Sequence, residues 1–482
     1  MNKTLLLIPT FNEVENVYPL YLEIRKHTNR ADLLFIDDNS PDGTAEKIRE
    51  IIKADPNVKL LVREEKLGIG SAHLRGISYA YNKKYETLIT MDADFTHNPK
   101  SIQKLINKKQ DADVIVASRY LSRNGISDWN LFRKILAISG HYLTKKLLNM
   151  KYDSTGAFRL YNLKNIKKEV FGLIESDSYS FFFESLFILS LNNYKIAEVP
   201  IKLSSRTYGS SKMKIGDAWH SIKFLIQTAY LSKVYRDSYI WYPTYIKAKK
   251  SKSAAEAEWD RYWKMNRKKR KVLYDTLAVF YRVFIIRPYL NYFIRQTFKK
   301  NSKILHAGCG GGQVDSDVIK TMDITALDIS TEALNRYKYL YKNKCRVLHG
   351  DIMDIPSKSN TYDGIYNLGV MEHLNKKEIK KTLGEFHRVL KPGGKIVLFW
   401  PPFFGISVIF LNSVHFLLNT ILRRNIRLHP HEVSKVKSKK QIQYLLQKSN
   451  FRLTGYHFGV RDLFTYVVVV GEKNQLVSHN RK

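Results

Sequence analysis

Short apolar runs alternate with amphipathic stretches along two separate parts of the chain. In the first part each run ends in a polar turn, and the runs cover residues 4–9, 33–37, 58–62, 87–92 and 114–119. Such runs, separated by segments with helical periodicity, predict a parallel sheet that is covered by helices. Ligands of these sheets bind at the carboxyl ends of the strands. We therefore expect the first part of the chain to form an α/β domain.

The same alternation returns in the second part of the chain. Its apolar runs cover residues 303–308, 324–330, 346–352, 362–369 and 395–400. Two further runs, 451–457 and 464–470, are joined by a connection too short for a crossover helix, which predicts an antiparallel pair. We therefore expect two α/β domains of different design. They cover residues 1–235 and 301–482, with a basic, aromatic helical linker and the second domain's first helices over 236–300.

The composition restricts the class of protein and of partner. The chain has 482 residues, with 80 Lys and Arg against 44 Asp and Glu, a formal net charge of +36. This length exceeds one ordinary domain, and 44% hydrophobic residues exclude a disordered chain. Two cysteines cannot build a disulfide framework or a four-thiolate metal site. The charge favours nucleic acid, phosphorylated small molecules or an anionic membrane surface as partner. With no export signal in view, we expect a cytoplasmic protein.

Two segments suggest contact with a membrane surface. In the linker, Tyr262, Trp263, Tyr281 and Tyr289 interleave with basic residues, as on membrane-interface helices, although a solvated helical linker has the same pattern. Residues 403–422 carry no formally charged side chain and are about as long as the ~20 residues of a membrane span. Because polar residues interrupt them, we expect a lid or a helix that dips into the membrane, the alternative being a buried substrate lid.

Polar loops follow the first, second and fourth apolar runs of the first domain. In the last of these loops, Asp92 and Asp94 stand two residues apart at the end of an apolar strand. Such carboxylates suit a hard divalent cation that is also held by substrate phosphates. A cation there would neutralise a leaving diphosphate. A lone pair of acids in a surface turn is the alternative, but the two companion loops favour the binding site.

Eight stretches in order over residues 1 to about 215 resemble the family 2 glycosyltransferases, and most closely the dolichol-phosphate mannose synthases. They are PTFNEVEN, DDNSPDGT, EKLGIGSAHLRG, MDADFTHNP, ASRY, FRKIL, STGAFR and RTYGSSK. The resemblance implies a GT-A type nucleotide-sugar-binding domain. It further implies inverting transfer of a sugar, typically mannose from GDP-mannose, to the phosphate of a polyprenol of the dolichyl type.

The resemblance also assigns roles to single residues. The nucleotide-sugar contacts would be Pro9, Phe11, Glu13, Asp38, Asp92, Ala93, Asp94 and Lys212, the last in a closing loop. Asp94 and Thr96 would hold the divalent metal, Mg²⁺ or Mn²⁺. Catalysis would rest on Asp92 and Asp94 and on three arginines that hold phosphates, Arg119, Arg133 and Arg206. A lipid phosphate is already anionic, so this chemistry needs no strong general base. The chain departs from the family's pattern at Thr96, Ala137 and Phe182.

In the second domain, a glycine-rich turn follows the first strand, and such a turn is typical of a binding site for a nucleotide cofactor. Gly308, Gly310 and Gly312 permit a tight turn and close approach of the backbone to a ligand. Asp328, at the end of the next strand, is placed to accept hydrogen bonds from ribose hydroxyls, and Asp351 suits an adenine amino group. A glycine-rich turn alone would equally suit a dinucleotide.

The order HAGCGGG, ALDIS, GDI, VMEHL and LKPGGKIVL resembles the class I methyltransferases over about residues 300–482. The resemblance implies a Rossmann-like domain that binds S-adenosyl-L-methionine through Gly308, Gly310, Gly312, Asp328 and Asp351. It places Glu372 and His373 at the reaction centre. His373 is a candidate general base for a sugar hydroxyl, or else a histidine that packs near the cofactor. Neither Cys309 nor Cys345 is expected to be a nucleophile.

Together these patterns predict a bifunctional enzyme, peripheral on the cytoplasmic face of a membrane. It would glycosylate a polyprenyl phosphate and methylate a related sugar or glycan. One alternative is a polysaccharide-building enzyme with a non-lipid acceptor. The other is a basic RNA methyltransferase with a degenerate glycosyltransferase platform; the intact Asp92, Asp94 and Arg119, and the lack of an RNA-binding signature, argue against nucleic acid.

Overall fold

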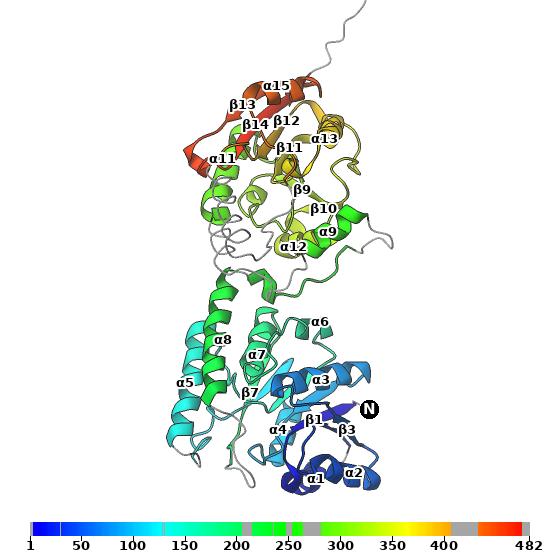
Figure 1. Cartoon of the computed structure of the whole chain (residues 1–482), viewed down its shortest axis with the longest axis vertical. Helices are drawn as coiled ribbons and strands as arrows, with labels where there is room; N and C mark the ends of the chain where they lie inside the picture. The colour runs from blue at the N-terminus through cyan, green and yellow to red at the C-terminus, as the bar shows by residue number, and fades with distance from the viewer. Residues whose placement is uncertain are drawn as a thin grey trace, which may run out of the picture. The chain divides into compact units, whose positions relative to one another are not determined.

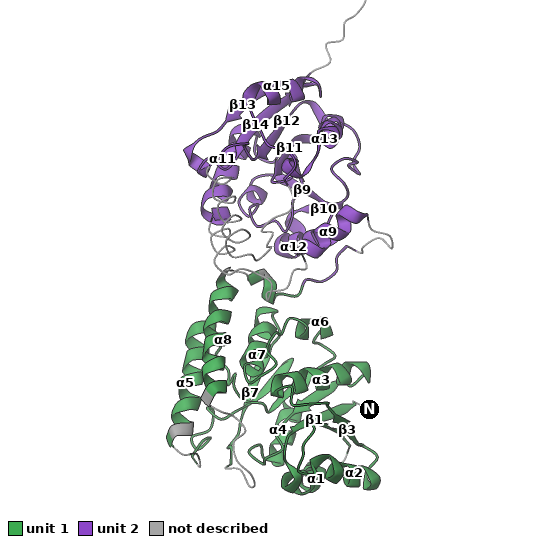
Figure 2. Ribbon diagram, in the orientation of Figure 1, with its two compact units in different colours: residues 1–241 green, residues 242–482 purple. Residues whose placement is uncertain are grey.

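The computed structural model divides into two compact units, residues 1–241 (unit 1) and 242–482 (unit 2) (Figure 2). The structure describes residues 3–28, 30–127, 129, 131–204, 215–234, 236–246, 253–263, 281–405 and 432–474. Most of the apolar segment 403–422 and much of the basic linker lie outside these ranges.

Unit 1 contains a seven-stranded sheet with the order β3-β2-β1-β4-β6-β5-β7. Its strands are β1 (Thr4–Thr10), β2 (Asp32–Asp37), β3 (Val58–Val62), β4 (Thr87–Thr90), β5 (Val114–Ser118), β6 (Arg159–Asn162) and β7 (Ile196–Pro200). The five apolar runs of the sequence are strands β1 to β5. The sheet is mixed rather than parallel, because β6 runs antiparallel to both β4 and β5. Only four residues long, β6 has too short an apolar run to stand out in the sequence.

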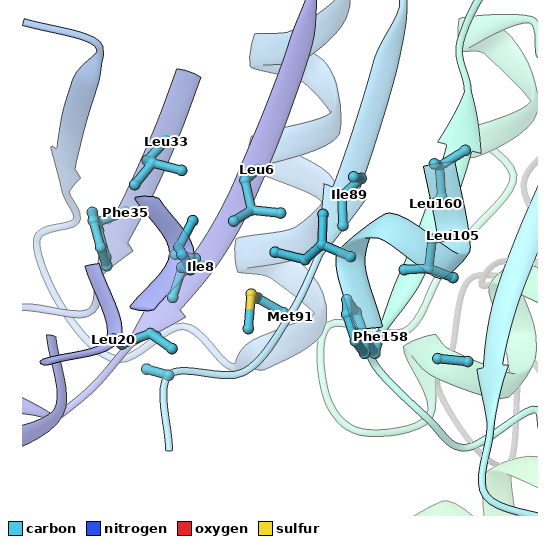
Figure 3. Packing of buried hydrophobic residues seen from close by; sticks show 14 of the residues in the cluster. Leu6, Ile8, Leu20, Leu33, Phe35, Ile89, Met91, Leu105, Phe158 and Leu160 are labelled. Carbon is cyan, nitrogen blue, oxygen red and sulfur yellow. The ribbon is translucent and has the colours of Figure 1, made fainter. Parts of the chain in front are cut away.

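Helices cover both faces of this sheet (Figure 1). They are α1 (Val14–His27), α2 (Thr44–Ala54), α3 (Ile69–Asn82), α4 (Ile102–Asn107), α5 (Leu131–Leu148), α6 (Lys168–Phe171), α7 (Phe181–Leu191) and α8 (Ile215–Val234), with short helices at Pro99–Ser101 and Arg236–Tyr239. On one face, alternate strand residues such as Leu6 and Phe35 pack with Leu20 of α1 and Leu105 of α4 (Figure 3). Successive residues of β1 are buried on both faces, which explains its unbroken apolar run.

Unit 2 contains a second seven-stranded sheet, with the order β10-β9-β8-β11-β12-β14-β13. Its strands are β8 (Lys303–Ala307), β9 (Asp323–Asp328), β10 (Arg346–His349), β11 (Tyr362–Leu368), β12 (Leu390–Trp400), β13 (Phe451–His457) and β14 (Val467–Lys473). The predicted antiparallel pair is confirmed, because β14 is antiparallel to β13 and also to β12. All strands of this sheet run parallel apart from β14, which is the Rossmann-like arrangement expected of the second domain.

The helices of unit 2 begin before its first strand. They are α9 (Ala254–Trp263), α11 (Arg287–Thr297), α12 (Thr331–Tyr341), α13 (Lys376–Val389) and α15 (Lys439–Gln447), with a π-helical turn at Arg282–Ile286 and short helices at Val318–Lys320, Lys342–Lys344, Met371–His373 and Val460–Asp462. Two apolar clusters fill the two faces of the sheet.

The aromatic residues of the linker pack inside unit 2. Tyr289 is buried in one of its apolar clusters, and Tyr281 donates its hydroxyl hydrogen bond to the carbonyl of Asp462 at 2.8 Å. Packing therefore explains these side chains without a membrane. Within the described ranges, no helix combines the length and the apolar character that a bilayer crossing needs.

Two candidate active sites

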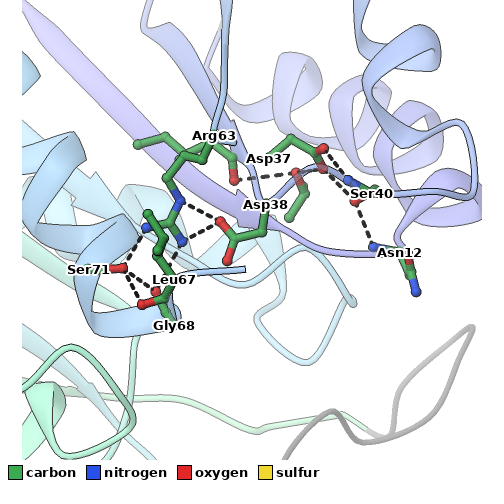
Figure 4. A network of polar contacts seen from close by, with 10 residues as sticks. Asn12, Asp37, Asp38, Ser40, Arg63, Leu67, Gly68 and Ser71 are labelled. Atoms are coloured by element: carbon green, nitrogen blue, oxygen red, sulfur yellow. Dashed lines mark hydrogen bonds and ion pairs between the residues drawn. The ribbon is translucent and has the colours of Figure 1, made fainter. Parts of the chain in front are cut away.

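The loops after β1 and β2 meet at one edge of the unit 1 sheet, because these strands are adjacent and parallel. Asp37 ties the two loops together: its carboxylate accepts from the Thr10 hydroxyl at 2.8 Å and from the Ser40 hydroxyl at 2.6 Å. The backbone amide of Asn12 in turn donates to Ser40 Oγ at 2.9 Å (Figure 4). The same edge carries Pro9, Phe11 and Glu13, which sequence reasoning assigned to the nucleotide.

Asp38 is buried beside this junction and is paired with Arg63. The guanidinium donates to Asp38 from Nε at 2.6 Å, to Ser71 Oγ at 2.5 Å and to the carbonyl of Gly68 at 3.1 Å (Figure 4). Burial raises the pKa of Asp38, although Arg63 opposes the shift. Sequence reasoning missed Arg63, whose one signal was its place directly after the apolar run of β3. The arrangement fixes the loop that leads into α3.

The loop after β4 brings the predicted acidic pair to the same edge of the sheet. Asp94 is buried and accepts two hydrogen bonds from Thr96, from the hydroxyl at 2.6 Å and from the amide at 3.1 Å. The Asp92 side chain is 33% exposed, and Nδ1 of His97 lies 3.7 Å from its carboxylate. The Asp92 amide also donates to that nitrogen at 3.0 Å. Ala93 between the two acids is buried.

These residues fit a divalent cation of the kind that takes only part of its ligands from protein. Within the described ranges, no three His, Cys, Asp or Glu side chains form a cluster that could hold a metal unaided. Mg²⁺ is commonly held by one or two carboxylates together with substrate phosphates and water. Two carboxylates on one loop, one of them partly exposed, match this donor set.

Arg119 follows β5 and forms a buried pair with Asp153. Its Nε donates to Asp153 at 2.7 Å and its Nη2 at 3.2 Å, a bidentate arrangement. Although burial alone would raise the pKa of Asp153, the Arg119 guanidinium holds it below the usual value. Asp153 was not singled out in the sequence. Of the other predicted arginines, Arg133 lies on α5 with a side chain outside the described residues, and Arg206 lies wholly outside them, as does Lys212.

In unit 2, the glycine-rich turn leaves β8 with three glycines at positive φ. Gly308 has φ +76° and Gly310 φ +53°, and a Cβ on Gly308 would lie 2.4 Å from Val370 Cγ2. The turn is tied to Asp328 at the end of β9, which accepts from the Gly310 amide and from the Ser330 amide, each at 2.8 Å. Burial raises the pKa of Asp328. The predicted turn and its acid are thus neighbours in the structure.

The other predicted residues of unit 2 lie at the next strand ends. Asp351, after β10, accepts from the Met353 amide at 2.8 Å. Glu372 and His373 belong to the short helix after β11; Glu372 is buried, and burial raises its pKa to about 8. The His373 ring meets the ring of Trp259 edge-on at 5.4 Å, a contact that sequence reasoning missed.

Both cysteines are buried and free. Burial raises the pKa of the Cys345 thiol to about 11 and that of Cys309 well above its ordinary value. Protonated, buried thiols are poor nucleophiles, which agrees with the expectation that neither attacks a substrate.

Known proteins resemble both units. A family model described as "Glycosyl transferase family 2" matches residues 6–170, and one described as "Methyltransferase domain" matches residues 304–394. The chain is 32% identical over 216 residues to the undecaprenyl-phosphate mannosyltransferase of Micrococcus luteus, which covers 44% of this chain and 88% of that protein. The chain belongs to the family 2 glycosyltransferases. It is also 31% identical over 214 residues to the polyprenol monophosphomannose synthase of Mycolicibacterium smegmatis, covering 44% of this chain and 81% of that protein.

Among solved structures, the chain is similar to a SAM-dependent methyltransferase of Methanosarcina mazei. The TM-score is 0.32, and the identity is 17% over 38% of this chain and 97% of the other. It is also similar to the magnesium protoporphyrin IX methyltransferase of Synechocystis, with a TM-score of 0.34 and 12% identity over 46% and 95% of the two chains. The enzyme thus combines a glycosyltransferase unit with a methyltransferase domain, as the sequence motifs predicted.

Proposed function

We propose that unit 1 transfers mannose from GDP-mannose to a polyprenyl phosphate with inversion at the anomeric carbon. The observation that carries this proposal is the single edge of the sheet at which the Asp37–Asp38 loop, the Asp92–Asp94 loop and buried Arg119 follow β2, β4 and β5. The two relatives named above are a mannosyltransferase for undecaprenyl phosphate and a synthase of polyprenol monophosphomannose. Both names fit the proposed acceptor.

In the proposed reaction, a phosphate oxygen of the lipid attacks the anomeric carbon from the side opposite the nucleotide. The bond between that carbon and the diphosphate oxygen breaks, and the electron pair leaves with the GDP. The attacking oxygen is already anionic, so no side chain has to remove a proton. What the protein supplies is position and charge: Asp38 and the Asp37 junction would set the nucleotide loop, and Arg119, held in place by Asp153, would supply positive charge to a phosphate.

Asp92 and Asp94 would hold Mg²⁺ or Mn²⁺ together with the diphosphate. Bound there, the cation would neutralise charge on the leaving diphosphate. Thr96 orients the Asp94 carboxylate through its two hydrogen bonds, and His97 lies against Asp92. These two residues keep the acidic loop in one conformation.

Helices α5 and α8 support a position on the membrane surface. On α5, Leu131, Ile135, Ile138 and Tyr142 are exposed at spacings of four, three and four residues, which places them on one helix face. On α8, Trp219, Ile226 and Tyr230 repeat the pattern, and Trp219 is 71% exposed. The two helices lie side by side and carry Lys134, Lys145, Lys146, Lys223 and Lys233 (Figure 1). Apolar side chains next to lysines suit an anionic lipid surface.

Replacing Ile138, which is 53% exposed, with serine should weaken binding to vesicles of phosphatidylglycerol and phosphatidylcholine severalfold. Leu22→Ser on α1 is the matched control, because Leu22 is 45% exposed on a different helix. Cosedimentation measures both. Equal binding of the two variants would remove α5 from the membrane contact and leave the position on the cytoplasmic face without this support.

We further propose that unit 2 transfers a methyl group from S-adenosyl-L-methionine to a hydroxyl of a related sugar or glycan. The acceptor oxygen attacks the methyl carbon, the carbon–sulfur bond breaks, and its electron pair stays on sulfur to give S-adenosylhomocysteine. Gly308, Gly310, Gly312 and Asp328 would hold the cofactor and Asp351 its adenine. His373 would take the hydroxyl proton.

One incubation tests both halves. The enzyme is mixed with labelled GDP-mannose, undecaprenyl or dolichyl phosphate, methyl-labelled S-adenosylmethionine and added RNA, and the organic extract and the aqueous fraction are both analysed by mass spectrometry. The expected product is a mannosyl phospholipid, with methyl label on a sugar in the lipid or aqueous fraction. Sugar that reaches only a water-soluble glycan would refute the lipid acceptor, and methyl label that reaches only added RNA would refute the sugar acceptor.

A further inference from the structure

Helix α9 lies across the carboxyl ends of four strands in unit 2. Its side chains reach the segments that follow β8, β9 and β11 and the last residue of β10. The four side chains are Glu256, Trp259, Asp260 and Trp263. Their i, i+3, i+4, i+7 spacing puts them on a single helix face, and α9 lies beside α12 (Figure 1). One face of α9 therefore spans the crevice in which the methyl donor is proposed to bind.

Asp260 fastens the helix to the segment after β9. Its buried carboxylate accepts from the Ser330 hydroxyl at 2.5 Å, from the Glu332 amide at 3.3 Å and from the Thr331 hydroxyl at 3.4 Å. The amide of the same Ser330 donates to Asp328. Two buried carboxylates thus share one serine, and the Asp260 charge acts on Asp328. This concentration of negative charge favours a cationic ligand.

The two tryptophans contact the segments that follow the adjacent strands β8 and β11. A Cβ placed on Gly310 would lie 2.8 Å from Cζ2 of Trp263, and one on Gly311 would lie 3.1 Å from Cζ3. The Trp263 ring therefore sits directly on the glycine-rich turn. Its carbonyl accepts a hydrogen bond from Arg336, whose guanidinium lies 5.6 Å from the ring. After β11, Trp259 meets His373, and at β10, the outermost of the four strands, Glu256 lies 3.5 Å from His349.

We infer that α9 is a lid on the methyl-donor site, with Trp259 and Trp263 as its inner wall and Asp260 as the latch that keeps it closed. The inference rests on the proposed use of S-adenosylmethionine by unit 2. Aromatic faces and carboxylates together bind a sulfonium cation with apolar substituents. Because Trp263 covers the turn, a cofactor on that turn enters and leaves when α9 moves. Release of the product S-adenosylhomocysteine is then limited by the latch.

The test measures how fast labelled S-adenosylhomocysteine leaves the full-length enzyme after a chase with unlabelled compound. Asp260→Asn weakens the latch without changing its shape, and Trp263→Ala removes the wall; both should release the ligand at least tenfold faster than the wild type. The matched controls are Glu258→Gln and Arg261→Ala, which change exposed residues of the same helix. Trp263→Phe keeps an aromatic ring and should release close to the wild-type rate.

The possible outcomes separate this inference from the proposed function. If the wild type does not bind S-adenosylhomocysteine, the proposed methyl donor is wrong and the lid falls with it. If the wild type binds but Asp260→Asn releases as slowly as Glu258→Gln, the methyl donor stands and the lid is wrong. Tighter binding by Trp263→Ala would also overturn the lid, because it would make the ring an obstruction. Thermal melting of each variant identifies loss of folding, and Asp260→Asn keeps the test decisive where Trp263→Ala does not fold.

Discussion

The two candidate sites differ in what pairs with some of their buried carboxylates. In unit 1, two of them pair with guanidinium groups: Arg63 pairs with Asp38, and Arg119 binds Asp153 through two of its nitrogens. In unit 2, Asp328 accepts from two backbone amides. Arg119 holds the pKa of Asp153 low despite burial, whereas burial raises the pKa of Asp328 and, against the effect of Arg63, that of Asp38.

This difference matches the charge of the proposed ligands. A site with paired arginines and an acidic pair of which one member, Asp92, is partly exposed suits phosphates and the cation that accompanies them. A crevice of carboxylates set in backbone amides lacks that compensation and gains it from a cationic cofactor. Under the proposed functions, one chain of strongly basic composition therefore has one site for anions and one for a cation. Net charge alone predicts only the first.

The largest expected effect is on the acidic pair of unit 1. Asp94→Ala should lower sugar transfer about 100-fold or more, because it removes a carboxylate that is proposed to hold the cation at the leaving diphosphate. Product formation from labelled GDP-mannose measures it, and binding of S-adenosylhomocysteine to the same variant shows that unit 2 is folded. Sugar transfer within a few-fold of the wild type would mean that the pair is a surface turn.

The reciprocal change is Asp328→Asn in unit 2. The amide group cannot accept from both Gly310 and Ser330, so affinity for S-adenosylhomocysteine should fall about 10- to 100-fold. Isothermal titration measures the affinity, and sugar transfer by the same sample is the internal control. A parallel loss of both activities would contradict the independence of the two sites.

Breaking the buried pair of unit 1 should reduce stability rather than chemistry alone. Asp153→Asn leaves the buried Arg119 charge without its carboxylate, which costs about 3–5 kcal/mol of unfolding free energy for a pair of this kind. Hydrogen exchange read by mass spectrometry should show lost protection in peptides of β5 and β6, with peptides of β8 and β9 unchanged. Asp111→Asn, at an exposed ion pair with Lys108, is the control and should be nearly neutral.

The pattern of residues along short stretches of the sequence predicted those parts of the molecule whose structure depends on interactions between sequence neighbours. Strands β1 to β5 and β8 to β14, the glycine-rich turn at Gly308 and the antiparallel end of unit 2 all follow from apolar runs, glycines and connection lengths, whereas β6 and β7 were not predicted. The short antiparallel β6 escaped, because its four residues carry no distinct periodicity and its place depends on β4 and β5.

Partners that are distant in sequence could not be predicted. Asp153 stands 34 positions from Arg119, and Asp260 stands 70 positions from Ser330. In the sequence, Asp260 and Trp263 belong to a charged, aromatic linker, a pattern that equally describes a solvated helix. Only tertiary packing distinguishes that helix from one that covers a ligand crevice, because both have the same amphipathic spacing.

The smallest predicted effect concerns Glu372, whose burial raises its pKa from 4.5 to about 8. Between these values the native state keeps a proton that the unfolded chain has lost, so unfolding free energy falls as pH rises and levels off above about 8. Glu372→Gln should remove this decline, which for one group is at most about 1.4 kcal/mol per pH unit.

Asp462, with a pKa raised by burial to about 6, adds its own decline at lower pH, so the range from pH 6 to 8 isolates Glu372. Hydrogen exchange of β11 and β12 peptides, corrected for intrinsic rates, provides the measurement, and Glu258→Gln should keep the wild-type slope. Equal slopes in Glu372→Gln and the wild type would mean that this carboxyl ionises freely in the folded unit, and the contrast between the two crevices would then rest on Asp328 and Asp260 alone.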